Sequence, residues 1–216
     1  MHVVSVNVGV PRTVPWHGKA VATGIWKEPV AGRVAIVGDN LVGDRQADLT
    51  VHGGRDKAVY GYPTEHYAWW RTQLPDVELP WGAFGENLSV AGLIETHVHI
   101  GDRFRIGTAE LMVTQPRMPC FKLGIRFDRP TLVKEFLRSE RSGFYFAVVR
   151  AGEVGAGDVI ERVHEEPTSM TVTDLVRLSV ALHIAADVLR RAVATPGLAE
   201  VWREEFRQRL EQQSDP

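Results

Sequence analysis

The single cysteine of this chain, Cys120, lies in a setting that favours chemistry at sulfur. It follows the segment Gln115-Pro116-Arg117-Met118-Pro119 and precedes Phe121-Lys122. A lone cysteine excludes an intramolecular disulfide and a metal site built from several cysteines. The prolines restrict the preceding backbone, and the flanking cations favour the thiolate, which attacks electrophiles and binds soft metals. A buried structural cysteine is the simplest alternative, but such residues usually lie in apolar strands or helices.

A second segment with chemical potential is Val51-His52-Gly53-Gly54-Arg55-Asp56-Lys57. Adjacent glycines let the backbone approach a ligand closely, and consecutive N–H groups can cradle an anion. Arg55 and Lys57 supply the positive charge that a phosphate would need. A glycine hairpin turn with solvated charges explains the same residues. The spacing matches neither a Walker A loop nor a dinucleotide-binding fingerprint, so this segment alone is a weak signal.

Two further segments carry polar side chains beside glycine or in alternation. In Gly82-Ala83-Phe84-Gly85-Glu86-Asn87-Leu88, the Asn87 amide can both donate to and accept from a heterocycle edge. An asparagine that closes a turn beside an exposed glutamate fits equally well. His97-Val98-His99 would place both imidazoles on one face of a strand, as in many metal sites. Histidines that simply face water remain the simpler interpretation.

Composition narrows the class of protein. The chain has 216 residues, 44% hydrophobic and 24% charged, with a formal net charge of −2. These values are typical of one globular domain with or without a small appendage. No basic field indicates nucleic acid as a partner, and no apolar run of about 18 residues indicates a membrane span. The first residues resemble no signal peptide, and a single cysteine fits a reducing compartment, so we expect a cytoplasmic protein.

The first three quarters of the chain read as short strands bounded by turn residues, which favours a closed barrel or a sandwich. The expected strands are His2–Val8, Lys19–Trp26, Arg33–Val37, Lys57–Tyr62, Arg103–Ile106, Glu110–Thr114, Phe144–Arg150 and Asp158–Val163. Apolar residues at helical spacing after a proline predict two helices, Thr64–Gln73 and Thr131–Arg138.

The character of the sequence changes near Glu165–Thr168, which is polar and broken by proline. Thr171 to Asp174 then has the pattern of a capping box before a first amphipathic helix. A second short helix is expected around residues 184–193, and a four-residue apolar repeat from Leu198 to Leu210 predicts a third. We therefore expect a β-rich domain at 1–165 and a three-helix extension at 168–212.

Taken in order, several stretches resemble the MOSC domain, the molybdenum-cofactor-binding fold named after the C-terminal part of molybdenum cofactor sulfurases. The resemblance spans roughly residues 20–165, is strongest to the bacterial YiiM-type branch, and includes a three-helix extension. It rests on Gly43-Asp44-Arg45-Gln46-Ala47-Asp48, His52 to Tyr60, Tyr62-Pro63-x-Glu65-His66-Tyr67, Gly85-Glu86-Asn87-Leu88, Gly92-Leu93-x-Glu95, Ile100-Gly101-Asp102 and Gln115-Pro116-Arg117-x-Pro119-Cys120. It implies a mainly β fold with α (α+β): a MOSC-type β-barrel with short helices and a small C-terminal three-helix tail.

The same resemblance implies a site. Cys120 would be the thiolate ligand to molybdenum in a molybdopterin cofactor, in keeping with the softness of sulfur. The pterin and its phosphate would be held by Lys27 and by the turn residues His52, Gly53, Gly54, Arg55 and Lys57. The rest of the pocket would be lined by Glu86, Asn87 and Arg117.

The activity implied by the resemblance is reduction of N-hydroxylated bases such as 6-N-hydroxylaminopurine, a detoxification reaction. No flavin, haem or iron–sulfur motif occurs, so a separate reductase would supply electrons. A cofactor or sulfur carrier without turnover is the main alternative. A cysteine hydrolase is a third, although no histidine lies near Cys120 in sequence. A homodimer is compatible with the sequence.

Overall fold

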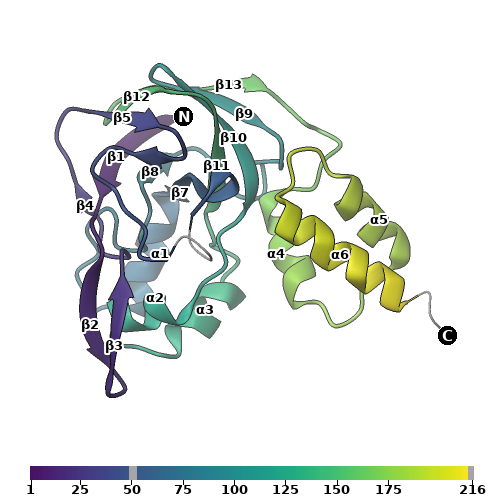
Figure 1. Cartoon of the computed structure of the whole chain (residues 1–216), viewed down its shortest axis with the longest axis horizontal. Coiled ribbons are helices and arrows are strands. Elements are labelled where there is room, and N and C mark those ends of the chain that lie inside the picture. The colour runs from purple at the N-terminus through teal and green to yellow at the C-terminus, as the bar shows by residue number, and fades with distance from the viewer. Residues whose placement is uncertain (49–52, 214–216) are drawn as a thin grey trace.

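The main sheet curves into a barrel in this computed structural model, which describes residues 1–48 and 53–213. Across the sheet, the strands follow the order β13 (Ile160–His164), β9 (Arg103–Ile106), β10 (Ala109–Pro116), β11 (Phe144–Arg150), β7 (Val59–Pro63), β8 (Leu88–Ala91), β1 (His2–Val8) and β4 (Glu28–Pro29). An antiparallel bridge joins His2 to Val159, and Ile160 N donates to Met1 O at 3.0 Å. These contacts connect β1 to the start of β13, so the sheet closes as a barrel rather than a sandwich (Figure 1).

One pair of neighbouring strands in the barrel is parallel. β7 and β8 run in the same direction, whereas the other paired strands of the main sheet are antiparallel. A parallel pair needs a crossover connection, usually a helix, and here the chain passes through α1 (Glu65–Gln73). The expected helix Thr64–Gln73 is therefore confirmed, and it returns the chain to the barrel beside β7.

Smaller sheets flank the barrel. β2 (Arg12–Trp16) and β3 (Lys19–Thr23) form a hairpin, and β12 (Gly152–Gly155), β5 (Arg33–Val37) and β6 (Asn40–Leu41) form a three-stranded sheet. The expected strand Lys19–Trp26 ends early, at Thr23. The residue that follows is Gly24, whose added Cβ would lie 2.6 Å from Arg45 O, so two chain segments come together closely there.

Helices cover the pocket side of the barrel. η1 (Arg55–Lys57) is a single 3₁₀ turn, α2 (Phe121–Arg126) follows Cys120, and α3 (Leu132–Arg138) matches the expected helix Thr131–Arg138. Sequence analysis did not predict α2, because it is short and contains Gly124. That glycine lets the helix pack against Pro130, whose Cα would lie 3.1 Å from an added Cβ. These helices enclose an aromatic core of Tyr62, Tyr67, Trp70, Phe84, Phe127 and Phe136.

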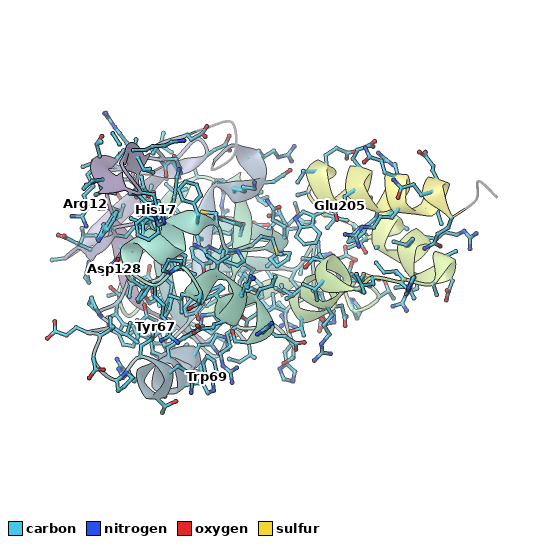
Figure 2. The ribbon with its side chains drawn as sticks, turned by 90° about the horizontal axis from the view of Figure 1, so that it is seen from below. Arg12, His17, Tyr67, Trp69, Asp128 and Glu205 are labelled. Atoms are coloured by element: carbon cyan, nitrogen blue, oxygen red, sulfur yellow. The ribbon has the colours of Figure 1, made fainter. Side chains whose placement is uncertain are left out.

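Three helices form the tail: α4 (Val172–Val180), α5 (Ala186–Ala194) and α6 (Glu200–Gln212). The predicted capping box is confirmed, since Asp174 N donates to Thr171 Oγ1 at 3.1 Å and Thr171 N donates to Asp174 Oδ2 at 3.0 Å. The tail projects from one end of the molecule. In Figure 2, Glu205 marks α6, and Arg12 and His17 mark the β2–β3 hairpin at the other end.

Tail and barrel share one hydrophobic core. Leu175, Leu189, Trp202 and Phe206 are buried in the same cluster as the barrel interior. Gly197 packs so closely on the barrel that an added Cβ would lie 2.9 Å from Gly101 Cα. The division into units at 1–165 and 168–212 therefore stays a prediction. In the part of the chain that the structure describes, no helix has the length and apolar character needed to cross a membrane.

Candidate cofactor pocket

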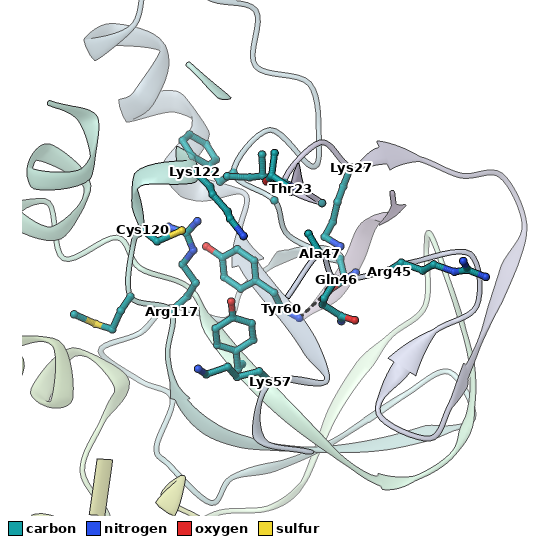
Figure 3. A pocket seen from close by; sticks show the side chains of 17 residues that line it. Thr23, Lys27, Arg45, Gln46, Ala47, Lys57, Tyr60, Arg117, Cys120 and Lys122 are labelled. Carbon is teal, nitrogen blue, oxygen red and sulfur yellow. Dashed lines mark hydrogen bonds between the residues drawn. The ribbon is translucent and has the colours of Figure 1, made fainter. Parts of the chain in front are cut away.

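Five of the residues singled out in the sequence meet in one pocket. Lys27, Lys57, Asn87, Arg117 and Cys120 all line it, although they are far apart in the chain (Figure 3). The empty space within the pocket, including its mouth toward solvent, is about 690 Å³.

Cys120 lies where β10 gives way to α2. Its backbone is extended (φ −117°, ψ 171°), and its carbonyl accepts a 2.9 Å hydrogen bond from Leu123 N in the first turn of α2. The side chain is half-buried and borders the pocket. Arg117 N donates to Gly143 O at 3.3 Å, which fixes the start of the proline-flanked segment to the chain entering β11. The thiol is therefore held at the pocket wall by backbone contacts on both sides.

Arg117 is the most deeply buried cation of the pocket, with 6% of its surface exposed. Its guanidinium lies over the rings of Phe136 and Tyr60, at 5.2 and 5.6 Å from their centroids. Burial acts to lower the pKa of Arg117, but its interactions with Tyr60, Tyr145 and Cys120 outweigh this, and the pKa is raised. The buried Nη1 has no hydrogen-bond partner among the described residues. A charged donor is thus left for a ligand.

Lys27 and Asn87 belong to a buried polar network in the pocket wall. Lys27 Nζ lies 2.5 Å from Asp44 Oδ1, and Asn87 Nδ2 donates to Asp44 Oδ2 at 3.0 Å. Asn87 Oδ1 accepts from Tyr60 N at 3.1 Å. Burial lowers the pKa of Lys27, and the carboxylates of Asp44 and Glu86 oppose that change. Because these groups already satisfy one another, their main contribution is to hold the wall in place.

Two lysines approach the pocket from opposite sides. Lys57 ends η1, and burial lowers its pKa while the neighbouring Asp56 opposes this. Lys122 on α2 is 9% exposed and points into the pocket in Figure 3. With Lys27, Arg45 and Arg117 they make five basic lining residues, and no Asp or Glu among the described residues lines the pocket. The site is therefore suited to an anion.

Two tyrosines that sequence analysis did not select complete the wall. The rings of Tyr60 and Tyr145 lie 5.2 Å apart, and Tyr60 donates its hydroxyl to Ser142 O at 2.8 Å. Burial raises the pKa of both hydroxyls, although the charge of Arg117 opposes this. Both tyrosines therefore stay protonated and neutral at physiological pH. They come from neighbouring strands, β7 and β11, so no local sequence signal could have paired them.

The segment from Gly53 to Lys57 lies only partly in the pocket. Arg55 is exposed, and neither it nor Gly53 nor Gly54 lines the cavity. Gly54 has φ +81°, which favours glycine, and it leads into the 3₁₀ turn that carries Lys57. The turn thus directs Lys57 inward and Arg55 outward. His52 lies outside the described residues.

Glu86 does not line the pocket, contrary to the expectation from sequence. It is fully buried behind the wall, where its carboxylate accepts from Tyr67 Oη, Gly82 N at 2.9 Å, Phe84 N at 3.1 Å and Ser89 Oγ at 2.9 Å. Burial raises the pKa of Glu86, and these hydrogen bonds oppose the rise. Its role is to organise the turn before β8, because every donor around it comes from the protein itself.

The histidines lie elsewhere. His97 is exposed, and His99 faces the buried Asp102, with 3.8 Å between Nδ1 and Oδ2. His66 Nε2 lies 2.7 Å from Glu95 Oε2 under α1. Within residues 1–48 and 53–213, no group of three or more His, Cys, Asp or Glu residues is arranged to hold a metal. A metal at Cys120 would therefore need its remaining ligands from a bound group.

Two family descriptions match the chain. Residues 48–161 match the MOSC domain, and residues 170–213 match the YiiM-like 3-alpha helix domain. Similar proteins include YflK of Bacillus subtilis, 40% identical over 94% of this chain and 92% of YflK. YiiM of Escherichia coli is 36% identical over 92% of this chain and 88% of YiiM. A protein of Gibberella moniliformis named "Reductase" is 31% identical over 83% of this chain but only 32% of its own length.

The fold agrees with this likeness. The crystal structure of YiiM from Geobacillus stearothermophilus superposes with a TM-score of 0.81 at 33% sequence identity, covering 97% of this chain and 98% of that one. Barrel, pocket side and three-helix tail are thus all matched by a solved structure. The chain belongs to the MOSC domain family, and its tail is a YiiM-like three-helix domain.

Proposed function

We propose that this protein is a molybdenum-cofactor-dependent reductase of N-hydroxylated bases, with 6-N-hydroxylaminopurine as a representative substrate. The observation that carries the proposal is the convergence of Cys120 with Arg117, Lys57 and Lys122 on one pocket. Membership of the MOSC family and the relative named "Reductase" support an oxidoreductase associated with a molybdenum cofactor.

The residues present fit an anionic pterin cofactor. The buried Nη1 of Arg117 lacks a partner among the described residues, and an unsatisfied buried donor is costly unless a ligand or water completes it. The lining includes the cations Lys57, Arg117 and Lys122, and none of its described residues is an Asp or Glu. The protein offers one soft donor, Cys120, so the cofactor's own dithiolene sulfurs would complete the ligand set of molybdenum.

When bound, such a cofactor supplies two-electron redox chemistry at molybdenum. Cys120 would hold the metal through its thiolate, and the charge of Arg117 would favour that ionised form. Lys57 and Lys122 would neutralise the phosphate. Tyr145, neutral and at the pocket wall, is placed to hydrogen-bond a heterocycle.

The overall reaction consumes two electrons and two protons. The N–O bond of the hydroxylamine breaks, the nitrogen becomes an amine, and the oxygen leaves as water. The electrons would come from a separate reductase, because the sequence carries no flavin, haem or iron–sulfur motif. A reducing compartment suits a chain with a single functional thiol, so we place the reaction in the cytoplasm.

A carrier that holds the cofactor or sulfur without turnover is the alternative, since a deep cationic pocket beside a thiol would serve that role as well. A cysteine hydrolase is disfavoured by the pocket, because none of the described residues that line it is a histidine.

The test uses protein expressed in a host that makes the cofactor. We expect molybdenum and pterin in the purified protein, and reduction of 6-N-hydroxylaminopurine with reduced methyl viologen as donor. Bound cofactor without turnover would indicate the carrier. Lys57→Met and Arg55→Met provide a matched pair, because both residues lie in η1 but only Lys57 lines the pocket. Lys57→Met should lower cofactor content, whereas Arg55→Met should not. Equal loss in both would contradict the proposed anion site.

A further inference from the structure

A hydrogen bond links the helical tail to the strand that leads into the pocket. Trp202 lies near the start of α6 and is 6% exposed. Its indole Nε1 donates to Gln115 Oε1 at 2.8 Å, and both groups are buried. Ala199 N, at the beginning of the same helix, donates to Thr114 O at 3.2 Å. The end of β10 is therefore held by α6 through a side chain and through the backbone.

Gln115 extends this contact to η1. Its Nε2 donates to Asp56 O at 3.0 Å, in the turn that carries Lys57. The same carbonyl also accepts from Thr114 Oγ1 at 2.7 Å. Because Trp202 holds the amide oxygen of Gln115, the amide nitrogen is turned toward Asp56 and cannot rotate away without leaving a buried group unsatisfied.

The same glutamine begins the segment that ends at Cys120. Pro116 and Pro119 stiffen this segment, so a change in the position of Gln115 is passed along it rather than absorbed. Lys57, Arg117 and Cys120 then meet at the pocket. We propose that Trp202 is a positioning residue: through Gln115, the three-helix tail sets the placement of Lys57 and of the Cys120 segment relative to each other. This positioning role does not depend on which reaction the pocket catalyses.

Alkylation of Cys120 by iodoacetamide tests this link, because the chain has only this one thiol. Trp202→Phe keeps an aromatic ring in the core but removes the donor to Gln115. With the cations no longer held in place, we expect the pH midpoint of alkylation to rise and the rate at neutral pH to fall by about threefold. A folded variant whose midpoint and rate equal those of the wild type would overturn the proposal.

Leu189→Ala is the matched control, because Leu189 is fully buried in α5 and does not line the pocket. It should lower the melting temperature of the protein and leave the alkylation profile unchanged. If it shifts the profile as Trp202→Phe does, general loosening of the tail explains both results and the specific link is wrong.

A double-mutant cycle separates the link from simple packing. Gln115→Leu removes both hydrogen bonds of the glutamine side chain, so it should raise the alkylation midpoint at least as much as Trp202→Phe. Adding Trp202→Phe to Gln115→Leu should then produce no further shift, since residues that act through one contact are not additive. Two full, additive shifts would show that Trp202 acts independently of Gln115. If Trp202→Phe fails to fold, Gln115→Leu alone still tests the link. An unchanged alkylation midpoint in that variant would overturn the proposal.

Discussion

Replacing Asn87 with aspartate should turn a hydrogen bond in the pocket wall into a repulsion between two buried carboxylates. Asn87 Nδ2 donates to Asp44 Oδ2 at 3.0 Å, and both residues are almost fully buried. Aspartate has nearly the shape of asparagine, so packing changes little. The substitution therefore isolates the electrostatic part of the network that holds Lys27 and the wall of the pocket.

The expected loss of unfolding free energy follows from the distance between the two side chains. Two unit charges 3.0 Å apart repel by about 5.5 kcal/mol at an effective dielectric constant of 20. Protonation of one carboxyl limits this cost, because neutralising a group with an ordinary pKa of about 3.9 at pH 7 takes roughly 4 kcal/mol. The expected loss of unfolding free energy is thus about 4 kcal/mol at pH 7. It should shrink by about 1.4 kcal/mol for each unit of pH decrease toward pH 4, because the folded variant holds one more proton than its unfolded chain.

Urea denaturation of wild type and variant at pH 4.5, 5.5 and 7 measures this dependence. Asn40→Asp is the control, because Asn40 Nδ2 donates to a backbone carbonyl, Asp44 O, at 2.7 Å, and the residue is only partly buried. The loss of unfolding free energy should be smaller for Asn40→Asp than for Asn87→Asp, and it should depend less on pH. A stability difference for Asn87→Asp that stays constant over this range would refute the paired-carboxylate argument.

Three further outcomes are expected. Gly143→Ala should lower the free energy of unfolding by at least about 2 kcal/mol. Gly143 has φ +61°, and an added Cβ would lie 2.5 Å from Gly61 O. Thermal unfolding measures this loss. Glu86→Gln should cost about 1–3 kcal/mol in urea denaturation, because an amide NH₂ would face donors only. The affinity of the apoprotein for pyrophosphate, measured by calorimetry, should fall as pH rises through the pKa of Lys57, because the lysine then loses its charge. Burial lowers this pKa from 10.5. Lys57→Met should remove that part of the pH dependence.

Much of the fold could be predicted from local sequence patterns. The tail helices follow from a four-residue apolar repeat and the capping box at Thr171, because helix formation depends on neighbours within one turn. The strands follow from short alternating runs between turn residues. α2 was missed because its six residues include Gly124, whose value lies in packing against Pro130.

Local sequence alone predicts the part of the site in which a basic residue lies close to the cysteine in the chain. Arg117 and Cys120 share one short segment, so their proximity follows from sequence. Tyr60 and Tyr145 meet only because β7 and β11 pair, and this contact has no local signal. Glu86 and Asn87 are adjacent in sequence, yet only Asn87 reaches the pocket. The burial of Glu86 depends on donors from the turn before it and from Tyr67, which a linear pattern cannot reveal.

The central claim, that the Cys120 thiolate holds a catalytic molybdenum, is tested most directly by turnover per bound molybdenum in Cys120→Ser. Serine is similar in size but offers a hard hydroxyl that does not ionise readily near neutral pH. The melting curve of the variant should match that of the wild type, because Cys120 is only half-buried at the pocket wall. Reduction of 6-N-hydroxylaminopurine with reduced methyl viologen should be lost. Wild-type turnover in the serine variant at equal molybdenum loading would contradict the account and remove Cys120 from the mechanism.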